Sequence, residues 1–316
     1  MVSYIIGASM LVYLTGGTGY IGRQVVRDFA RAGHRIRALV RPGSDENLPQ
    51  ECRSAISIVS GDIREPGTLR GSMDGCDAVI HLPGLIREFP RRGITFRSVQ
   101  YEGSKNVIDE TYRSGVQRLL LMSANGVRAG APTEYYRTKW MAEEYLRQST
   151  LEWTIFRPSV VFGNEDEGFE NFITALMKQL RMLALIVPVP GNGRFLFQPV
   201  SVRNLSEGFL KSVQQKIGIG RIYEVGGIER FSFNDLLDRV AEKLRIRKVR
   251  FHQPVPFLRL TARIFDRFAF FPVSEDQLIM LLEGNVTERG GEFYKDFGIE
   301  PILFSDTVKP SLNSRA

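Results

Sequence analysis

The first half of the chain alternates short apolar runs with segments in which apolar residues recur every three or four positions. The runs have the length of buried strands, whereas the three- and four-residue spacing is that of helices with one buried face. This alternation predicts repeated strand–helix–strand units, which build a parallel sheet with helices on both faces. We expect strands at residues 11–14, 34–40, 56–60, 78–82, 118–123 and 153–156, with helices at 23–32 and 96–114.

Three glycines follow the first predicted strand at three-residue spacing. Gly16, Gly19 and Gly22 stand in the sequence LVYLTGGTGYIG, between the apolar run and a helical pattern. Positions without side chains allow a tight turn, close approach of the backbone to a pyrophosphate and close helix packing. N–H groups at the helix start face such an anion. The spacing is a variant of the GxGxxG fingerprint, and the alternative is an ordinary glycine-rich turn. The flanking strand and helix favour a dinucleotide site.

After residue 163 the strand–helix alternation loosens. We expect helices at 169–185, 233–244 and 275–283, and a strand at 222–225. The predicted fold class is α/β, a doubly wound Rossmann sheet with a smaller C-terminal substrate lobe. Residues 10–162 form the dinucleotide-binding domain, to which later segments can return, and residues 163–316 form mainly the smaller substrate or partner lobe.

Composition adds expectations about partners. The 316 residues are 43% hydrophobic and 24% charged, which is ordinary for a folded chain. A formal net charge of +7 favours an acidic ligand or an anionic surface. No nucleic-acid-binding motif accompanies this charge, so we expect no nucleic-acid partner. Cys52 and Cys76 lack metal-ligand and redox spacing, so we expect structural thiols, no metal and a reducing compartment.

The first nine residues lack a positively charged region ahead of their apolar stretch. We therefore expect no cleavable signal peptide, and Met10 could be the natural start. No apolar run reaches the length that spans a membrane. The expected location is cytoplasmic, with possible peripheral contact to a membrane.

Arg41 stands at the end of the second predicted strand. Rossmann proteins place an acidic residue there to bind the ribose 2′-hydroxyl of NAD, and an arginine nearby to bind the 2′-phosphate of NADP. Arg41, with Ser44 close behind, predicts a preference for NADP(H), with NAD(H) as the alternative cofactor. The competing interpretation is a solvated loop arginine.

Tyr135 and Lys139 lie four residues apart in a predicted helix, and therefore on one helix face. A neighbouring ammonium lowers the pKa of a phenol, which can then exchange a proton with a substrate hydroxyl or carbonyl. Ser123, at the end of the fifth predicted strand, can orient the same oxygen. The three residues predict a catalytic site. The alternative is a surface helix that carries Tyr and Lys by coincidence.

TGGTGYIG at residues 15–22, the Tyr135/Lys139 pair and FRPSVVFG at 156–163 together resemble the extended and atypical short-chain dehydrogenase/reductases, which include NAD-dependent epimerases and dehydratases. The nearer likeness is to the branch of the nucleotide-binding accessory subunit of respiratory complex I. The segments that carry it are HLPGLIRE at 81–88, RTKWMAEEYLRQ at 137–148 and FLFQPVSVRNLSEGF at 195–209. The resemblance covers most of residues 10–210.

This resemblance implies roles for individual residues. It makes Tyr135 the acid/base, Ser123 its helper and Lys139 the group that binds the nicotinamide ribose. Gln100 stands where members often have asparagine, which puts a proton relay there in doubt. The implied cofactor contacts are the glycine turn (Gly16, Thr18, Gly19, Tyr20, Ile21, Gly22) for the pyrophosphate, Arg41, Asp62 and Ile63 for the adenosine end, Leu82, Pro83 and Gly84 beneath the cofactor, and Pro158 and Val160 near the carboxamide.

Three functions are compatible with the sequence. The first is an NADP(H)-dependent oxidoreductase acting on an unknown small molecule, in which the nicotinamide carries the hydride. The second is a nucleotide-sugar epimerase or dehydratase. The connection from Ser123 to Tyr135 is shorter than in sugar-nucleotide epimerases, which leaves less chain for a sugar pocket. The third is a non-catalytic, nucleotide-bound scaffold or respiratory-complex assembly protein.

Residues 256–272, PFLRLTARIFDRFAFFP, carry a second pattern. On a helix, Arg259, Arg263 and Arg267 form a basic stripe beside an aromatic one. This composition is typical of segments that lie at an anionic membrane surface or dock on a partner. The alternative is a helix that covers the substrate site with its aromatic residues packed inward. That covering helix is the favoured interpretation, and peripheral membrane or protein-complex contact through this segment is the hypothesis that competes with it.

Overall fold

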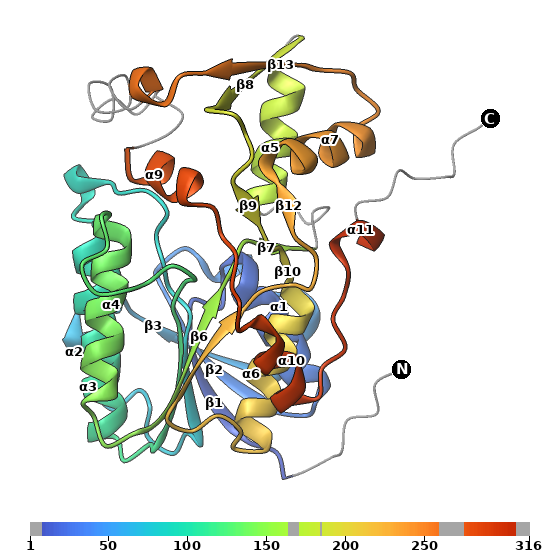
Figure 1. Ribbon diagram of the computed structural model, residues 1–316. Helices are drawn as coiled ribbons and strands as arrows, with labels where there is room; N and C mark the ends of the chain where they lie inside the picture. Colours follow the sequence, from blue (N-terminus) through green and yellow to red (C-terminus); the bar gives the residue numbers. More distant parts are fainter. Residues whose placement is uncertain (1–7, 164–170, 184, 259–274, 308–316) are drawn as a thin grey trace.

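A seven-stranded sheet forms the centre of the molecule (Figure 1). The computed structural model describes residues 8–163, 171–183, 185–258 and 275–307. The strands of the sheet are β1 (Leu11–Thr15), β2 (Arg35–Val40), β3 (Ile56–Ser60), β4 (Ala78–His81), β5 (Arg118–Met122), β6 (Glu152–Pro158) and β11 (Arg221–Val225). They are parallel throughout, in the order β11-β6-β5-β4-β1-β2-β3. The predicted α/β class with a parallel sheet is confirmed.

The central strands are buried on both faces. In β1, Val12 and Leu14 pack into one hydrophobic cluster, whereas Tyr13 packs into a second cluster on the other face. A strand covered on both sides reads as a continuous apolar run rather than an alternating one. This is why the strand could be recognised from its sequence.

Helices form a layer on each face of the sheet (Figure 1). On one face lie α1 (Tyr20–Arg31), α6 (Val202–Gln214) and α10 (Gly290–Phe297), and on the other α3 (Gly103–Arg113) and α4 (Glu134–Arg147). The helix expected at 96–114 instead begins as a π-helix, η4 (Arg97–Glu102), that continues into α3. Short helices in the connections are η1 (Asp45–Asn47), η2 (Gln50–Ala55), α2 (Pro66–Leu69) and η3 (Pro90–Arg92).

The chain enters the second lobe after β6 and then returns to the sheet. Strand β11 pairs with β6, in the register Arg221 to Thr154, and occupies the edge of the sheet. Helix α6 packs against α1, and α10 packs against β11 and α6. The half of the molecule that contains the sheet is therefore completed by residues that follow segments of the second lobe in the chain.

The second lobe has its own hydrophobic core, built around α5 (Phe172–Met182) and α7 (Phe233–Lys243), with Leu176, Val187 and Leu236 among its buried residues. No helix in the described ranges is long and apolar enough to cross a membrane. Most of the segment 256–272 lies outside the described residues. The elements of this half are β7 (Val161–Phe162), α5 (Phe172–Met182), β8 (Ile186–Pro190), β9 (Leu196–Phe197), β10 (Val200–Ser201), β12 (Phe231–Ser232), α7 (Phe233–Lys243), β13 (Val249–Gln253), α9 (Glu275–Glu283) and α11 (Phe304–Thr307).

Candidate nucleotide-binding and catalytic site

The direction in which strands are added to the sheet reverses between β1 and β4. Open α/β sheets bind ligands at the carboxyl ends of the strands, at such a reversal. The loops that follow these two strands are in close contact. A Cβ atom on Gly16 would lie 3.2 Å from the Pro83 nitrogen and 3.3 Å from the Leu82 Cβ. The predicted segments 16–22 and 82–84 therefore lie side by side at the carboxyl ends of the strands, where a ligand is expected.

The glycine turn leaves no room for side chains where it meets α1. Gly16 has a φ of +81°, and a Cβ on Gly22 would lie 2.1 Å from the Gly16 carbonyl oxygen. Gly19 directly precedes α1, and its N–H donates to the same oxygen at 3.1 Å. The first N–H groups of a helix have no acceptor within the helix, so an anion can take that place. The glycine turn therefore presents backbone atoms rather than side chains at the start of α1.

The other residues predicted in this turn are Thr18, Tyr20 and Ile21, all partly buried. The Tyr20 hydroxyl donates a hydrogen bond of 2.6 Å to the carbonyl of Gly163, at the end of the first lobe. This contact joins the start of α1 to the segment that leads into the second lobe.

The predicted adenosine site is a cluster of charges. Arg41 is exposed directly after β2, and Asp62 follows β3. Arg64 binds the Asp62 carboxylate through two donors, at 2.7 Å from Nη2 and 3.1 Å from Nε. Burial raises the pKa of Asp62, but the Arg64 hydrogen bonds and the charge of Arg41 hold it below its usual range. The neighbouring Ile63 is buried, and its carbonyl accepts from Asn106 at 2.8 Å.

Helix α4 carries Tyr135 and Lys139 on one face. The Thr133 side chain caps this helix by accepting the Tyr136 N–H, so the first turn begins just before Tyr135 and Lys139. Lys139 is buried, with an exposed fraction of 5%. Its ammonium donates to the Met122 carbonyl at 3.0 Å and to the Pro83 carbonyl at 3.4 Å. Lys139 thus lies at the carboxyl ends of β4 and β5, beside the strand reversal.

Burial sets the proton affinities of this pair. It raises the pKa of the Tyr135 phenol above its usual range, and the neighbouring Tyr136 raises it further. The expectation that Lys139 lowers the phenol's pKa was therefore wrong, because desolvation of the phenolate dominates. Burial also lowers the pKa of Lys139 to about 8, against the opposing effect of Glu143. Tyr135 is fully protonated at neutral pH.

The Tyr135 ring packs edge-on against Phe96 and Tyr136, with ring centroids 5.7 and 5.4 Å apart. Helix α9 of the second lobe covers the start of α4, where Asp276 accepts the Tyr135 backbone N–H at 3.3 Å. Residues of both lobes therefore fix the position of Tyr135.

Ser123 follows β5 and is buried. Its hydroxyl donates to the carboxylate of Glu143, which is fully buried on α4. Arg157 of β6 binds the same carboxylate, with 2.9 Å between Nε and Oε1. The structure therefore places Ser123 in a buried ion-pair cluster. The signal for this cluster in the sequence is a glutamate four residues after Lys139, on the same helix face.

A second buried hydrogen-bond network surrounds His81, and it could not be predicted from the sequence pattern. The Nδ1 atom of His81 lies 2.7 Å from the Thr15 hydroxyl, and its Nε2 atom lies 2.9 Å from the Ser104 hydroxyl. Ser104 donates to the Gln100 carbonyl at 2.6 Å, so Ser104 accepts from His81 Nε2. The Gln100 side chain accepts from Thr138 at 3.1 Å, next to Lys139. The network joins β1, β4, η4 and α4 around the site, and His81 serves as a structural residue.

The last predicted cofactor contacts follow β6. The carbonyl of Pro158 accepts the Asn125 N–H at 2.9 Å, and the carbonyl of Val160 accepts the Val200 N–H at 2.9 Å. These bonds fix the segment after β6 beside the segment after β5. The segment after β6 therefore lies at the carboxyl ends of the strands, as Ser123 and Lys139 do.

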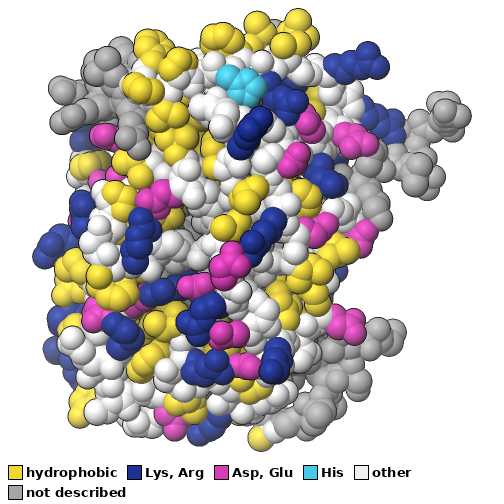
Figure 2. Space-filling model, viewed as in Figure 1, with side chains coloured by type: hydrophobic (Ala, Val, Ile, Leu, Met, Phe, Trp, Pro, Cys, Tyr) yellow, Lys and Arg dark blue, Asp and Glu magenta, His cyan; other side chains and the backbone are white. Residues whose placement is uncertain are grey.

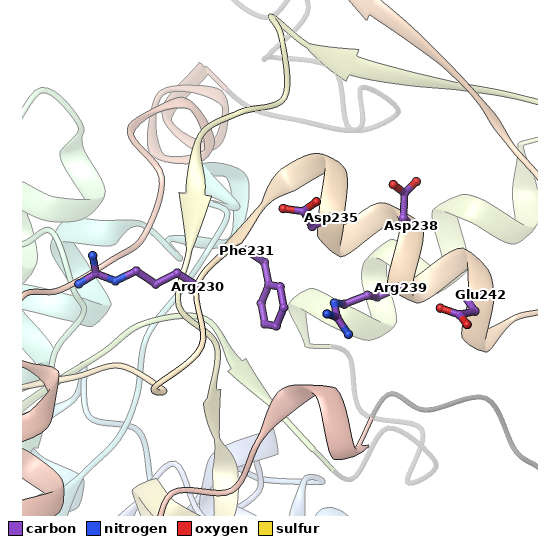
Figure 3. A pocket seen from close by; sticks show the side chains of 6 residues that line it. All are labelled: Arg230, Phe231, Asp235, Asp238, Arg239 and Glu242. Atoms are coloured by element: carbon purple, nitrogen blue, oxygen red, sulfur yellow. The ribbon is translucent and has the colours of Figure 1, made fainter.

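A hollow of ≈ 510 Å³ lies apart from these groups, beside α7 (Figure 3). Asp235, Asp238, Arg239 and Glu242 line it from the helix, and Phe231 lies beneath the Arg239 guanidinium at 4.7 Å. Arg230 points away from the others in Figure 3 and binds Glu288 at 3.1 Å. The lining of this hollow contains both acidic and basic side chains and none of the predicted nucleotide contacts.

The strand order and the glycine turn define a Rossmann-type nucleotide-binding fold. The family model described as NAD(P)H-binding matches residues 16–177, and the chain belongs to this family. Among relatives, the mitochondrial 40 kDa subunit of NADH-ubiquinone oxidoreductase from Neurospora crassa is 23% identical over 292 residues. That alignment covers 90% of this chain and 74% of the relative.

The photosystem II assembly factor Ycf39 of Trieres chinensis is also 23% identical, over 92% of this chain and 88% of the relative. The Bordetella bronchiseptica enzyme WbmG, solved with NAD and UDP, shares the fold with a TM-score of 0.73. Its identity is 19%, over 96% of this chain and 92% of that structure. The predicted likeness to the short-chain dehydrogenase/reductases and to complex I accessory subunits is confirmed.

Proposed function

We propose that this protein is an NADP(H)-dependent oxidoreductase in which Tyr135 transfers a proton and Lys139 positions the nicotinamide ribose. The observation that carries the proposal is the pairing of these residues on one face of α4. The Lys139 ammonium is held by backbone carbonyls at the carboxyl ends of β4 and β5. A Cβ on residue 84 would lie 3.2 Å from this ammonium. Because residue 84 is a glycine, no side chain occupies that space next to Lys139.

The protonation states favour reduction of a carbonyl. When bound, the dinucleotide supplies the hydride to the carbonyl carbon. Tyr135, whose pKa is raised by burial, donates its proton to the carbonyl oxygen, which gives an alcohol. The tyrosinate formed in this step regains its proton from solvent. Lys139, with a pKa of about 8, carries its charge at neutral pH.

The preference for NADP(H) rests on the adenosine end. Arg41 is exposed after β2, at the position where an acidic residue would bind the ribose hydroxyls of NAD. The nearest carboxylate, Asp62, is already neutralised by Arg64. The site therefore presents net positive charge, which suits a 2′-phosphate.

The test begins with the nucleotide that co-purifies with the protein, identified by mass spectrometry. Turnover of that nucleotide is then measured with a panel of carbonyl and quinone compounds. We expect Tyr135→Phe to abolish turnover and leave nucleotide affinity nearly unchanged, because only the transferable proton is removed. The adjacent Tyr136→Phe is the matched control and should retain turnover. Lys139→Ala should weaken both binding and turnover. Equal turnover in the two Phe variants would exclude Tyr135 from the reaction.

A second candidate is a nucleotide-bound protein without catalysis, which serves in the assembly of a respiratory or photosynthetic complex. The observation that favours it is the engagement of the Ser123 hydroxyl by Glu143. The similarity to a complex I subunit and to a photosystem II assembly factor supports the same idea. Tight nucleotide binding with no turnover across the panel, and no effect of Tyr135→Phe, would favour this function.

A further inference from the structure

The two-stranded sheet of the second lobe has an unusual outer face. Strands β8 and β13 are parallel, and Ile186 pairs with Val249 while Pro188 pairs with Phe251. Paired residues in a sheet point to the same side, and successive residues alternate. The inner side of β8 carries Val187 and Val189, which are buried in the core of the lobe. The outer side therefore carries the four residues of the two named pairs.

This outer face is apolar and exposed. The exposed fractions are 56% for Ile186, 57% for Val249 and 56% for Phe251. A sheet with one solvated face normally presents polar side chains to water. The apolar surface extends to Leu185, which is 58% exposed and accepts the Val249 N–H through its carbonyl. We define the β8–β13 patch as Met182, Leu185, Ile186, Val249 and Phe251.

Basic residues adjoin the patch along the chain. Five of the eight residues from Lys243 to Arg250 are Lys or Arg, and none is acidic. Arg181 is exposed next to Met182. The Lys248 ammonium binds the carbonyl of Leu183, where α5 ends, so it lies against the patch. Figure 2 shows hydrophobic side chains gathered along the top edge of the molecule, where Figure 1 places β8 and β13, with Lys and Arg beside them.

A groove of ≈ 390 Å³ adjoins the inner side of the same strands. Leu180 and Leu237 lie among its apolar lining residues, and Arg247, Lys248 and Arg250 line it as well. Two acidic residues of α7 also line it, and one of them, Asp238, pairs with Arg250 at 3.0 Å. The inner side of the two strands therefore also carries cationic side chains next to apolar ones.

We propose that the β8–β13 patch docks this protein on a membrane surface that contains anionic phospholipids. Exposed apolar side chains enter the boundary between headgroups and acyl chains, and Lys and Arg bind the phosphates around them. Charge complementarity decides for this occupant, because the exposed Arg181 and the Lys248 ammonium lie beside the apolar residues of the patch. The site is separate from the nucleotide site and does not depend on the proposed function.

The experiment is flotation of the full-length protein with lipid vesicles. One set contains phosphatidylcholine with phosphatidylglycerol, and the other contains phosphatidylcholine alone. We expect binding to the anionic vesicles at low salt, loss of that binding at high salt, and no binding to the neutral vesicles. Because each basic side chain near an anionic surface contributes about fivefold to partitioning, Arg181→Gln with Arg247→Gln should weaken binding at least about tenfold. Ile186→Ser with Phe251→Ser should weaken it similarly.

Matched controls keep net charge and exposed apolar area comparable. Arg35→Gln with Lys216→Gln removes two exposed charges near the amino ends of β2 and β11, and Tyr112→Ser with Ile219→Ser removes two exposed apolar side chains elsewhere. Nucleotide affinity and melting temperature show that each variant is folded. The proposal is overturned if the controls weaken binding as much as the patch variants, or if the patch variants bind like the parent. A dimer that Phe251→Ser dissociates would also overturn it, since a second copy would then cover the patch.

Discussion

The hydroxyl of Ser123 donates a hydrogen bond to the buried carboxylate of Glu143, one helical turn after Lys139. The same carboxylate binds Arg157, so Ser123 belongs to a cluster that joins β5, α4 and β6. Removing a donor from a buried carboxylate destabilises a protein by about 1–3 kcal/mol. This relationship separates the structural role of Ser123 from its proposed catalytic role.

We predict that Ser123→Ala lowers the free energy of unfolding by about 1–3 kcal/mol and reduces turnover less than Tyr135→Phe does. Urea unfolding and steady-state kinetics measure the two effects. A variant as stable as the parent but as inactive as Tyr135→Phe would show instead that Ser123 orients the substrate.

Arg41→Asp should reverse or erase the preference for NADP(H). A hydrogen bond from a charged group to a phosphate is worth about tenfold to a hundredfold in affinity, so the NADP(H) affinity should fall by that factor. Titration with both cofactors measures the change. Arg35→Asp, at the other end of β2, is the control and should leave the ratio of affinities unchanged. Equal affinities in the parent, with no change in Arg41→Asp, would make Arg41 an ordinary surface residue.

Gly22→Ala should disrupt the nucleotide turn. The added methyl would lie 2.1 Å from the Gly16 carbonyl oxygen, and neither backbone segment can move without opening the turn. We expect a loss of about 1–3 kcal/mol in stability and a loss of nucleotide binding. Gly67→Ala, where a Cβ meets no atom within 4 Å, should have neither effect. Calorimetric titration and thermal unfolding measure them.

The buried His81 predicts sensitivity to acid. Burial, and then the charge of Lys139, lower its pKa from 6.5 to about 3, so the folded chain keeps the ring neutral in mild acid. The unfolded chain binds a proton near pH 6.5, so the stability is complete above that pH and is lost as the pH falls towards 3. Between pH 7 and pH 5 the loss should be about 2 kcal/mol, and it should be absent in His81→Gln. Urea unfolding at both values measures it. An equal loss in parent and variant would assign the acid sensitivity to other groups.

The sequence allowed the local features to be predicted. The apolar run of β1 and the glycine turn are contiguous, so residues 11–22 carry their own structural signal. The candidate pair Tyr135 and Lys139 was also local, because four residues make one helical turn. Features that join distant segments could not be predicted in this way. His81 contacts Thr15 and Ser104, which lie 66 and 23 residues away.

The error over Tyr135 had the same origin. Its proximity to Lys139 follows from helical spacing, but its burial depends on Phe96 and on α9, far away in the chain. Desolvation raises the pKa of the Tyr135 phenol, whereas helical spacing alone had indicated that the Lys139 charge would lower it. The pairing of β8 with β13, which creates the apolar outer face, likewise joins strands about sixty residues apart.

The return of β11 to the edge of the sheet has a consequence for the nascent chain. On a ribosome, β6 is complete while residues 159–220 still separate it from β11. At a synthesis rate of about 5–20 residues per second, the partner strand follows roughly 3 to 12 seconds later. Throughout that interval the backbone N–H and C=O groups on one side of β6 have no strand to pair with. One edge of β6 therefore stays without a partner strand until residues 221–225 are synthesised, although the strands on its other side, from β1 to β5, are already complete.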